Sequence, residues 1–337
     1  MNWTKGHIDS LTGRIGSFEQ RAASLEQSEG DLSRRTADLE QSEGSIREAT
    51  ASLEQRLRTL QQRVDDLETQ NDDLLAAIAR RNLVQKPSFG LTENEKPVPT
   101  SPEESTAGDA EESVYTVLDY FKFENHFRGP RSVIRERQGI YLPYFRDQAG
   151  PVLDLGCGRG EFLQVMKQNN IPAFGIDLYP EYVEEGKLLD IDIRQGDGIA
   201  WLRESQEQYG GIYVGQVIEH ISFQQLQELC SLAFEKLLPD SWLILETPNP
   251  MCLSVFANSF YIDPTHNRLV HPLTLKYLLE EIGFHSVDIL FTECSRMDPL
   301  PLIKSDEIIN INEVNAGIRR VSDLLFGSQD YAVVARR

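Results

Sequence analysis

A strand, a glycine-rich turn and a helix follow one another within residues 151–168, and no other feature of the chain constrains its fold as strongly. Residues 152–155 are apolar apart from Asp154 and form a run of the length of a buried strand, and Glu161–Gln168 has the spacing of an amphipathic helix. The turn between them contains Gly156, Gly158 and Gly160. Glycines let the backbone turn sharply and let a ligand lie against bare amides. The segment therefore predicts a doubly wound α/β domain that binds a ligand at this turn.

Further apolar strands follow, and polar residues stand where they end. Residues 173–176 lead to Asp177 and Leu178, residues 192–196 to Asp197 and Gly198, residues 212–217 to Glu219 and His220, and residues 242–246 to a Thr-Pro-Asn-Pro segment. A last strand is expected at residues 331–335. Because the carboxyl ends of parallel strands lie at one edge of a sheet, we expect these polar residues to line one cleft.

The glycine turn resembles motif I of the class I S-adenosylmethionine (SAM)-dependent methyltransferases. Its spacing is GxGxG, it lacks a third glycine at the dinucleotide-binding spacing, and Asp154 precedes it inside the strand. The resemblance implies SAM as the cofactor and a Rossmann-like, seven-stranded α/β fold over residues 113–337. It also implies that Asp177 binds both ribose hydroxyls, that Leu178 flanks the adenine and that Asp197 contacts the adenine amino group. The expected cofactor-binding residues are Arg137, Asp154, Gly156, Cys157, Gly158, Gly160, Asp177, Leu178, Asp197, Gly198 and Gln216.

An arginine-rich segment, residues 127–145, precedes the first strand. Its apolar residues are spaced as on an amphipathic helix that covers one end of the fold. One of its arginines could pair bidentately with the methionyl carboxylate of the cofactor. We choose Arg137 because it is close in sequence to the turn into the first strand.

The loop of residues 260–272 gathers histidines, an aspartate and an arginine between prolines, as acceptor-binding loops over a cleft often do. A hydroxyl acceptor must lose a proton, so His220 is our first candidate base and His266 the second, with Asp263 beside them. These histidines could instead hold the loop by hydrogen bonds, above all His271. Glu219 could orient His220 or face solvent. A metal on Asp263, His266 and His271 is the alternative, but no ligand spacing requires one, and none is expected.

The N-terminal segment carries one apolar residue every seven. From residue 8 to residue 78 these positions are Leu11, Phe18, Leu25, Leu32, Leu39, Ile46, Leu53, Leu60, Leu67 and Leu74. Such a heptad pattern without proline predicts a coiled coil over residues 1–85 that makes the protein a homo-oligomer through residues 8–78. A solvated single helix is the alternative. Residues 86–112 are rich in Pro, Ser, Thr, Gly and Glu, which predicts a disordered linker.

The formal net charge of −20 disfavours a nucleic-acid partner, because phosphate backbones bind clustered Lys and Arg. There is no transmembrane segment, since no apolar run approaches the roughly 18 residues that a spanning helix needs, and no signal-peptide core. The four cysteines are widely separated and read as reduced thiols. We therefore expect a cytoplasmic protein, either free or peripheral at the inner membrane.

Several segments resemble a narrower group within the superfamily. FRG…IRER…YLPYF, VLDLGCGRGEFL, QVIEHI, ETPNP and FYIDPTHNRLVHP, within residues 115–290, are similar to methyltransferases of bacterial surface-polysaccharide synthesis. That group includes the chain-terminating O-antigen methyltransferase–kinases, in which a coiled coil acts as ruler and scaffold, and domains fused to glycosyltransferases. Here the heptads precede the catalytic domain and no kinase domain is present, so methylation of a terminal phosphate would need a separate kinase.

This resemblance implies an O-methyltransferase that acts on the non-reducing end of a glycan or lipid-linked oligosaccharide, with glycosyltransferases as partners and a sugar hydroxyl as the favoured acceptor. Two alternatives stay open. The VIEH segment also occurs in ubiquinone-biosynthesis O-methyltransferases, which indicates a small phenolic or quinone-like acceptor. A SAM-binding scaffold within a polysaccharide assembly complex would bind the cofactor without turnover.

Overall fold

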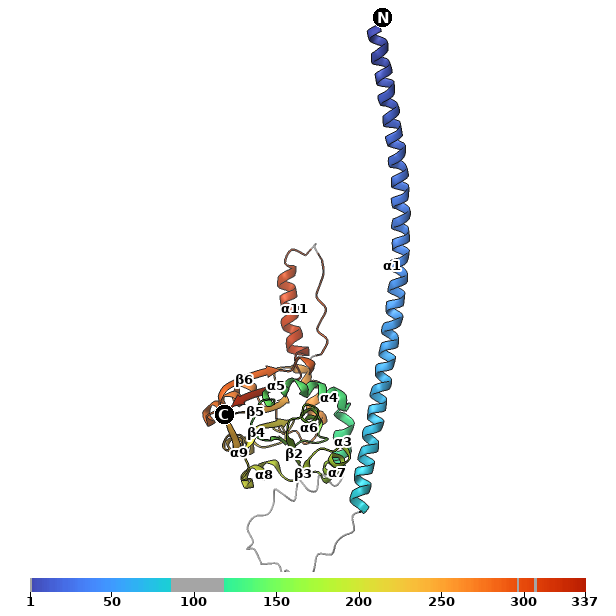
Figure 1. Ribbon diagram of the computed structural model, residues 1–337. Coiled ribbons are helices and arrows are strands. Elements are labelled where there is room, and N and C mark those ends of the chain that lie inside the picture. Colours follow the sequence, from blue (N-terminus) through green and yellow to red (C-terminus); the bar gives the residue numbers. More distant parts are fainter. Residues whose placement is uncertain (1, 86–117, 296, 306–307) are drawn as a thin grey trace, which may run out of the picture. The chain divides into compact units, whose positions relative to one another are not determined.

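The computed structural model describes residues 2–85, 118–295, 297–305 and 308–337 (Figure 1). Seven strands form one mixed sheet in the order β3-β2-β1-β4-β5-β7-β6. The strands are β1 (Val152–Leu155), β2 (Ala173–Asp177), β3 (Ile193–Gln195), β4 (Tyr209–Gly215), β5 (Leu237–Pro248), β6 (His285–Phe291) and β7 (Asp330–Arg336). The first five pair in parallel, and β7 lies antiparallel between β5 and β6. The predicted seven-stranded α/β fold is confirmed.

The strand order reverses beside β1, because β2 pairs with one of its edges and β4 with the other. Open α/β sheets bind ligands outside the carboxyl ends of their strands at such a switch point. β4 starts at Tyr209 and ends at Gly215, whereas its sequence predicts residues 212–217. The two residues that drop out of the strand therefore belong to the turn that leads to Glu219 and His220.

Helices and shorter turns connect and cover the strands. They are α1 (Asn2–Gln85), α3 (Tyr120–Phe127), α4 (Arg131–Gln138), η1 (Gly139–Tyr141), α5 (Leu142–Phe145), α6 (Glu161–Gln168), α7 (Pro180–Leu189), α8 (Gly198–Glu204), α9 (Phe223–Lys236), η2 (Val255–Ser259), η3 (Phe260–Ile262), α10 (Pro272–Ile282), η4 (Glu293–Ser295) and α11 (Ile311–Phe326).

The core has two layers, one on each face of the sheet. Successive side chains of a strand point to opposite faces of the sheet. In β1, Leu153 packs in the layer formed with α8, α9 and α10, and Val152 packs in the layer formed with α5 and α6. Both side chains are fully buried. This arrangement covers the sheet on both faces and leaves its strand ends for the ligand.

The N-terminal helix is continuous from Asn2 to Gln85, which confirms the predicted helix. Contacts divide the chain into Met1–Leu67 and Glu68–Arg337, so the last turns of α1 belong to the second unit. Within Met1–Leu67 the heptad leucines whose side chains are described stay exposed; Leu25 and Leu39 each keep 70% of their surface. An exposed row of leucines is what a coiled-coil partner would cover. The supercoil and its oligomer remain predictions.

The second unit contains a buried ion-pair network that starts on the last turns of α1. Asp72 pairs with Arg131 at 2.6 Å and with Arg159 at 3.2 Å. Arg131 also binds Glu185 at 2.5 Å, and Arg159, the residue between the second and third glycines of the turn, binds Glu161 at 2.6 Å. All five side chains are buried. The network therefore ties α1, α4 and α7 to the glycine turn.

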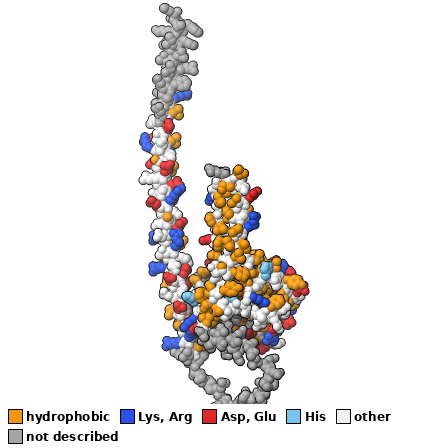
Figure 2. Space-filling view, turned by 180° about the vertical axis from the view of Figure 1, so that it is seen from behind, with side chains coloured by type: hydrophobic (Ala, Val, Ile, Leu, Met, Phe, Trp, Pro, Cys, Tyr) orange, Lys and Arg blue, Asp and Glu red, His pale blue; other side chains and the backbone are white. Residues whose placement is uncertain are grey.

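Residues 299–305 run beside α11, where the backbone of Ile303 exchanges hydrogen bonds of 3.0 and 2.9 Å with the Asn315 side chain. Figure 2 shows apolar side chains gathered on this projection. Leu324 of α11 is among the exposed apolar residues of the chain. None of its described residues lines the cavity considered below.

The predicted linker, residues 86–112, lies outside the described residues. Among the helices that are described, none combines the length and the hydropathy of a bilayer-spanning segment. Cys157, Cys230 and Cys252, the cysteines whose side chains are described, are buried and form no disulfide with one another.

Candidate functional site

The glycine turn between β1 and α6 is built for close approach. Gly156, Gly158 and Gly160 all have positive φ, a region that side chains with a Cβ rarely adopt. A Cβ on Gly156 would also lie only 2.4 Å from Val217 Cγ2. The turn after β1 therefore meets the turn after β4 with no room for a side chain, and Gly156 lines a cavity at this junction.

That cavity has a volume of about 470 Å³ and lies at the carboxyl ends of β1, β2, β3 and β4. Many of the predicted site residues line it: Gly156, Asp177, Leu178, Asp197, Gly198, Gln216, His220, Asp263 and His266. The cofactor residues and the candidate acceptor residues, which the sequence separates by up to 110 positions, thus share one space.

Asp177 stands at the end of β2 with its carboxylate facing the turn. Its Oδ2 accepts a hydrogen bond from Gly158 N at 2.8 Å, and its Oδ1 accepts one from Tyr179 N at 3.0 Å. Burial, together with the nearby charge of Glu124, raises the pKa of Asp177 to about 6. Each oxygen keeps a lone pair for a ligand, and the carboxylate still ionises at neutral pH.

Asp197 and Leu178 form the neighbouring rim. Asp197 is the N-cap of α8, where its Oδ1 accepts a hydrogen bond from Ala200 N at 2.7 Å. This cap holds the carboxylate at the cavity mouth and leaves its other oxygen available. Leu178 is exposed and offers an apolar surface between the ends of β2 and β3.

Five predicted cofactor residues do not line the cavity: Arg137, Asp154, Cys157, Gly158 and Gly160. Asp154 and Cys157 are buried beneath the turn, and burial raises the pKa of both. Gln216 lines the cavity with an unusual positive φ of 59°, and its side-chain amide donates to Asp330 at 3.2 Å. The positive charge of Arg137 acts to lower the pKa of that same aspartate, Asp330, which places Arg137 near Asp330 and away from the cavity.

Arg128 is the arginine that does line the cavity. Its Nη1 pairs with Glu124 at 2.8 Å, its Nε lies 3.6 Å from Glu161, and a Cβ on Gly158 would be 3.8 Å from its Cζ. Burial lowers the pKa of Arg128, but Glu161 and Glu124 raise it by more, so the guanidinium stays charged. Arg128 belongs to the same arginine-rich segment as Arg137, and only the packing of α3 distinguishes the two.

A chain of hydrogen bonds fixes His220. Thr265 Oγ1 donates to Asp263 Oδ1 at 2.7 Å, and Thr265 Oγ1 lies 2.8 Å from His220 Nδ1. Since the threonine proton is used on the aspartate, His220 Nδ1 must be the donor of the second bond. Tyr120 also donates to Asp263, at 2.7 Å. His220 therefore keeps its Nε2 lone pair, and burial, reinforced by His266, lowers its pKa and keeps it neutral.

His266 is fixed in the same tautomer. Its Nδ1 lies 2.5 Å from the backbone oxygen of Phe260, which can only accept, so Nδ1 carries the proton and Nε2 the lone pair. The rings of His266 and His220 lie side by side with centroids 4.6 Å apart. His271, by contrast, is the N-cap of α10 and accepts a hydrogen bond from Leu273 N at 3.2 Å. This is the hydrogen-bonding role that the sequence offered for His271 in place of a catalytic one.

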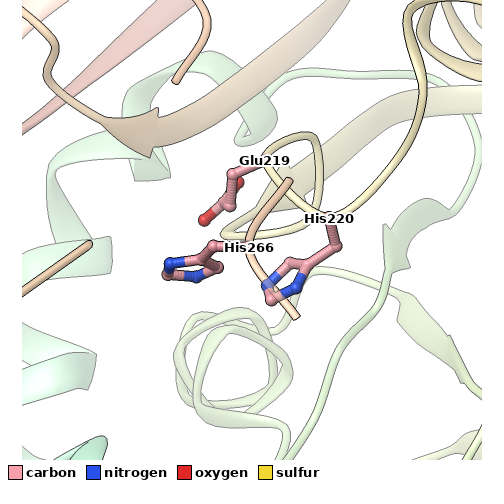
Figure 3. Close-up of side chains that lie close together, drawn as sticks. All are labelled: Glu219, His220 and His266. Carbon is pink, nitrogen blue, oxygen red and sulfur yellow. The ribbon is translucent and has the colours of Figure 1, made fainter. Parts of the chain in front are cut away.

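Glu219 completes this group (Figure 3). The side chain is fully buried; Oε2 accepts from Thr247 at 2.9 Å, and Oε1 has no hydrogen-bond partner among the described residues. Burial raises the pKa of Glu219 to about 8. Glu219, His220 and His266 each offer one ligand-capable atom, and these atoms lie within 4.8 Å of one another. The sequence suggested Asp263, His266 and His271 as the alternative metal ligands. Of these three residues, only His266 belongs to the group of Glu219, His220 and His266.

The residues around the cavity fit SAM. A nucleoside with an amino-acid tail needs acceptors for its ribose and amino groups, a cation for its carboxylate and an apolar surface for its base. Asp177, Asp197, Arg128 and Leu178 supply these groups around the bare backbone of the glycine turn.

The chain is similar to known methyltransferases. A family model described as a methyltransferase domain matches residues 125–289. The crystal structure of a SAM-dependent methyltransferase from Archaeoglobus fulgidus has 37% sequence identity and a TM-score of 0.61, and the match covers 65% of this chain and 99% of that one. The plantazolicin methyltransferase BamL, solved with a triazolic desmethylPZN analog and SAH, has 15% identity, a TM-score of 0.46 and coverages of 67% and 94%.

No curated protein matches the sequence at a significant level. The Archaeoglobus enzyme is nevertheless covered almost completely at 37% identity, and the glycine turn and the carboxylates at the strand ends meet in one cavity. This protein uses SAM and belongs to the SAM-dependent methyltransferases.

Proposed function

We propose that this protein is an O-methyltransferase that acts on a hydroxyl at the non-reducing end of a bacterial surface glycan. The observation that carries the proposal is the pair of imidazoles, His220 and His266, whose Nε2 lone pairs are left available beside the cofactor residues. A sugar hydroxyl is far less acidic than a thiol or an ammonium group, so it needs an acceptor for its proton during the transfer itself.

SAM supplies an electrophilic methyl group on a sulfonium. In our proposal Asp177 accepts from the ribose hydroxyls, Asp197 from the adenine amino group and Arg128, in place of Arg137, pairs with the methionyl carboxylate. Leu178 flanks the adenine, and the glycine turn, above the buried Asp154 and Cys157, provides the backbone surface. These contacts orient the donor, which is the principal need of an in-line displacement.

His220 is the group that we place against the acceptor hydroxyl. Its Nε2 accepts the hydroxyl proton while Asp263, acting through Thr265, holds the ring and stabilises the charge that develops on it. His266 is its neighbour and the second acceptor of that proton. Asp263 contacts His220 only through Thr265, so it is a positioning residue.

The cavity wall supports a polar acceptor with a ring. Tyr120 and Tyr179 stack with centroids 5.7 Å apart, and both line the cavity together with Asp263. Aromatic faces beside hydrogen-bonding groups suit the alternating apolar and hydroxyl surfaces of a sugar. The same faces favour the second candidate, a phenolic or quinone-like acceptor.

The heptads of α1 support a scaffold role in this proposal. A homo-oligomer through residues 8–78 would present several catalytic units to one polymer or to a glycosyltransferase complex. Residues 86–112 act as a linker in the same proposal, and the whole assembly works in the cytoplasm or at the inner membrane.

The test is mass spectrometry of surface glycans and lipid-linked intermediates from cells with the wild-type protein and cells with His220→Gln. Terminal residues heavier by one CH₂ group in the wild type alone are expected. If no glycan changes while the purified protein methylates a catechol, the small-molecule alternative replaces the proposal. SAM binding without turnover on either acceptor would leave only the scaffold.

A further inference from the structure

Glu219, His220 and His266 each turn one atom with a lone pair toward the same space, and all three atoms are acceptors once Glu219 is ionised. Both imidazoles spend their Nδ1 protons on other partners, Thr265 for His220 and the backbone of Phe260 for His266. Glu219 Oε1 is buried and accepts no hydrogen bond from any described residue. When Glu219 is ionised, three lone pairs therefore face one another and no other described residue donates to them, which is costly unless a positive group joins them. A cation would replace the proton that Glu219, with its raised pKa, otherwise holds at neutral pH.

The hydrogen bonds that hold these three side chains are of the kind that surround metal ligands in proteins. Histidines that bind metals usually donate their other ring N–H to a carboxylate, a backbone carbonyl or water, which fixes tautomer and orientation. Here His266 donates to a carbonyl and His220 to a hydroxyl that is itself bound to Asp263. The remaining oxygen of Glu219 is held by Thr247.

The backbone keeps the two contributing segments together. Asn267 N donates to Glu219 O at 2.8 Å, and Asn267 Nδ2 donates to His220 O at 2.5 Å. The turn after β4 and the loop that carries His266 therefore form one unit, although 46 positions separate His220 from His266 in the sequence. A site built from both is fixed by the fold and not by a local motif.

We propose that Glu219, His220 and His266 bind one divalent first-row transition cation, which in turn binds the acceptor oxygen. Two imidazoles and one carboxylate are a ligand set of Zn²⁺, Mn²⁺ and Fe²⁺ and not of Mg²⁺, which prefers oxygen. Nitrogen ligands at about 2.1 Å from a tetrahedral Zn²⁺ lie about 3.4 Å apart. Since the three ligand atoms lie within 4.8 Å of one another, side-chain rotation must draw them closer by about 1.4 Å at most.

The three ligands leave coordination positions open, and all three residues line the cavity. The inference rests on the proposed function and deepens it, since the open positions would take the acceptor hydroxyl. The cation would make that hydroxyl more acidic, so that its proton leaves to water. The oxygen then forms the bond to the methyl carbon as the sulfonium S–C bond breaks, its electron pair returns to sulfur, and S-adenosylhomocysteine leaves. With the cation bound, the two imidazoles hold the metal; direct proton transfer to His220 is what the metal-free protein would retain.

The test is a titration of the full-length, chelator-treated protein with Co²⁺, without cofactor or acceptor. The visible absorption of Co²⁺ reports nitrogen ligands directly, so this readout does not depend on activity. We expect one equivalent per chain, and binding weakened at least about 100-fold in His220→Ala and in His266→Ala. His271→Asn is the matched control, because this nearby histidine is outside the cluster and asparagine preserves its helix cap.

SAM affinity of each variant serves as the control for folding. The site is refuted if the wild type shows no Co²⁺ bands, or if the double His220→Ala, His266→Ala variant keeps them. Its catalytic role is refuted if glycan methylation is equally fast in metal-free protein and in protein reconstituted with Zn²⁺ or Mn²⁺. Co²⁺ bound at the cluster with no glycan methylated in any state would instead refute the proposed function and leave the metal site standing.

Discussion

Replacing Asp177 by asparagine should weaken SAM binding and remove its dependence on pH. A hydrogen bond to a charged group contributes about 1.5–3 kcal/mol, so loss of the charge should weaken SAM binding by about 10- to 150-fold. Asparagine keeps the shape and one acceptor for Gly158 N or Tyr179 N, so the turn should persist. The variant thus removes the charge and one of these two hydrogen bonds, because the NH₂ group of asparagine cannot accept.

The pH dependence follows from the raised pKa. In the free protein the pKa of Asp177 is about 6, and the ionised form binds ribose better. Affinity is therefore complete well above pH 6 and is lost as the pH falls through that value. If SAM binds only to protein in which Asp177 is ionised, its dissociation constant at pH 5 should be about tenfold higher than at pH 8.

Isothermal titration calorimetry with SAM at both pH values measures each effect. Asp190→Asn is the control, because Asp190 is an exposed carboxylate that pairs with Lys167 and lies outside the cavity. Comparison with Asp177→Asn also cancels any titration of the ligand itself. Wild-type affinity in Asp177→Asn at pH 8, or an unchanged pH dependence in that variant, would refute the ribose assignment.

Three further changes address the turn, the ion-pair network and the N-terminal helix. Gly156→Ala combines a positive φ with a Cβ 2.4 Å from Val217, so urea denaturation should show a loss of about 2–5 kcal/mol. Asp72→Ala removes the carboxylate that bridges two buried arginines; each keeps another carboxylate, so the same measurement should show a loss of about 3 kcal/mol. Replacing Leu57 and Leu60 together by aspartate should convert a multimer of the full-length protein into a monomer in light scattering, with unchanged SAM affinity.

A different result for each of these three variants would contradict the physical reason given for it. A fully stable Gly156→Ala protein would show that the two turns can move apart. An Asp72→Ala protein as stable as the wild type would mean that the network contributes only locally. A wild-type protein that scatters as a monomer would end the coiled-coil prediction.

Local chemistry determined the centre of the fold. The apolar residues of β1, the glycines that follow and the periodicity of α6 are encoded within about 17 consecutive residues, so their boundaries could be predicted without knowledge of the partners. The same holds for α1, because its helical conformation could be predicted from the heptad repeat within the segment itself. Asp177 and Asp197 could be placed at one edge because parallel strands all end there.

Tertiary packing decided which arginine faces the cavity and what the acceptor residues contact. Arg128 and Arg137 belong to one arginine-rich segment, and only the way α3 and α4 pack on the glycine turn brings the first to the cavity and the second toward Asp330. The Glu219 side chain is fully buried and accepts from Thr247, and none of the described residues bonds to its second oxygen.

The sequence by itself determined the elements and the edge of the sheet at which they end, because these follow from periodicity and from the rules of parallel pairing. The hydrogen bonds that fix the tautomers of His220 and His266, and the approach of both to Glu219, depend on contacts between a turn and a loop 46 residues apart. No local preference encodes such contacts, since they exist only once the packed sheet brings its strand ends together.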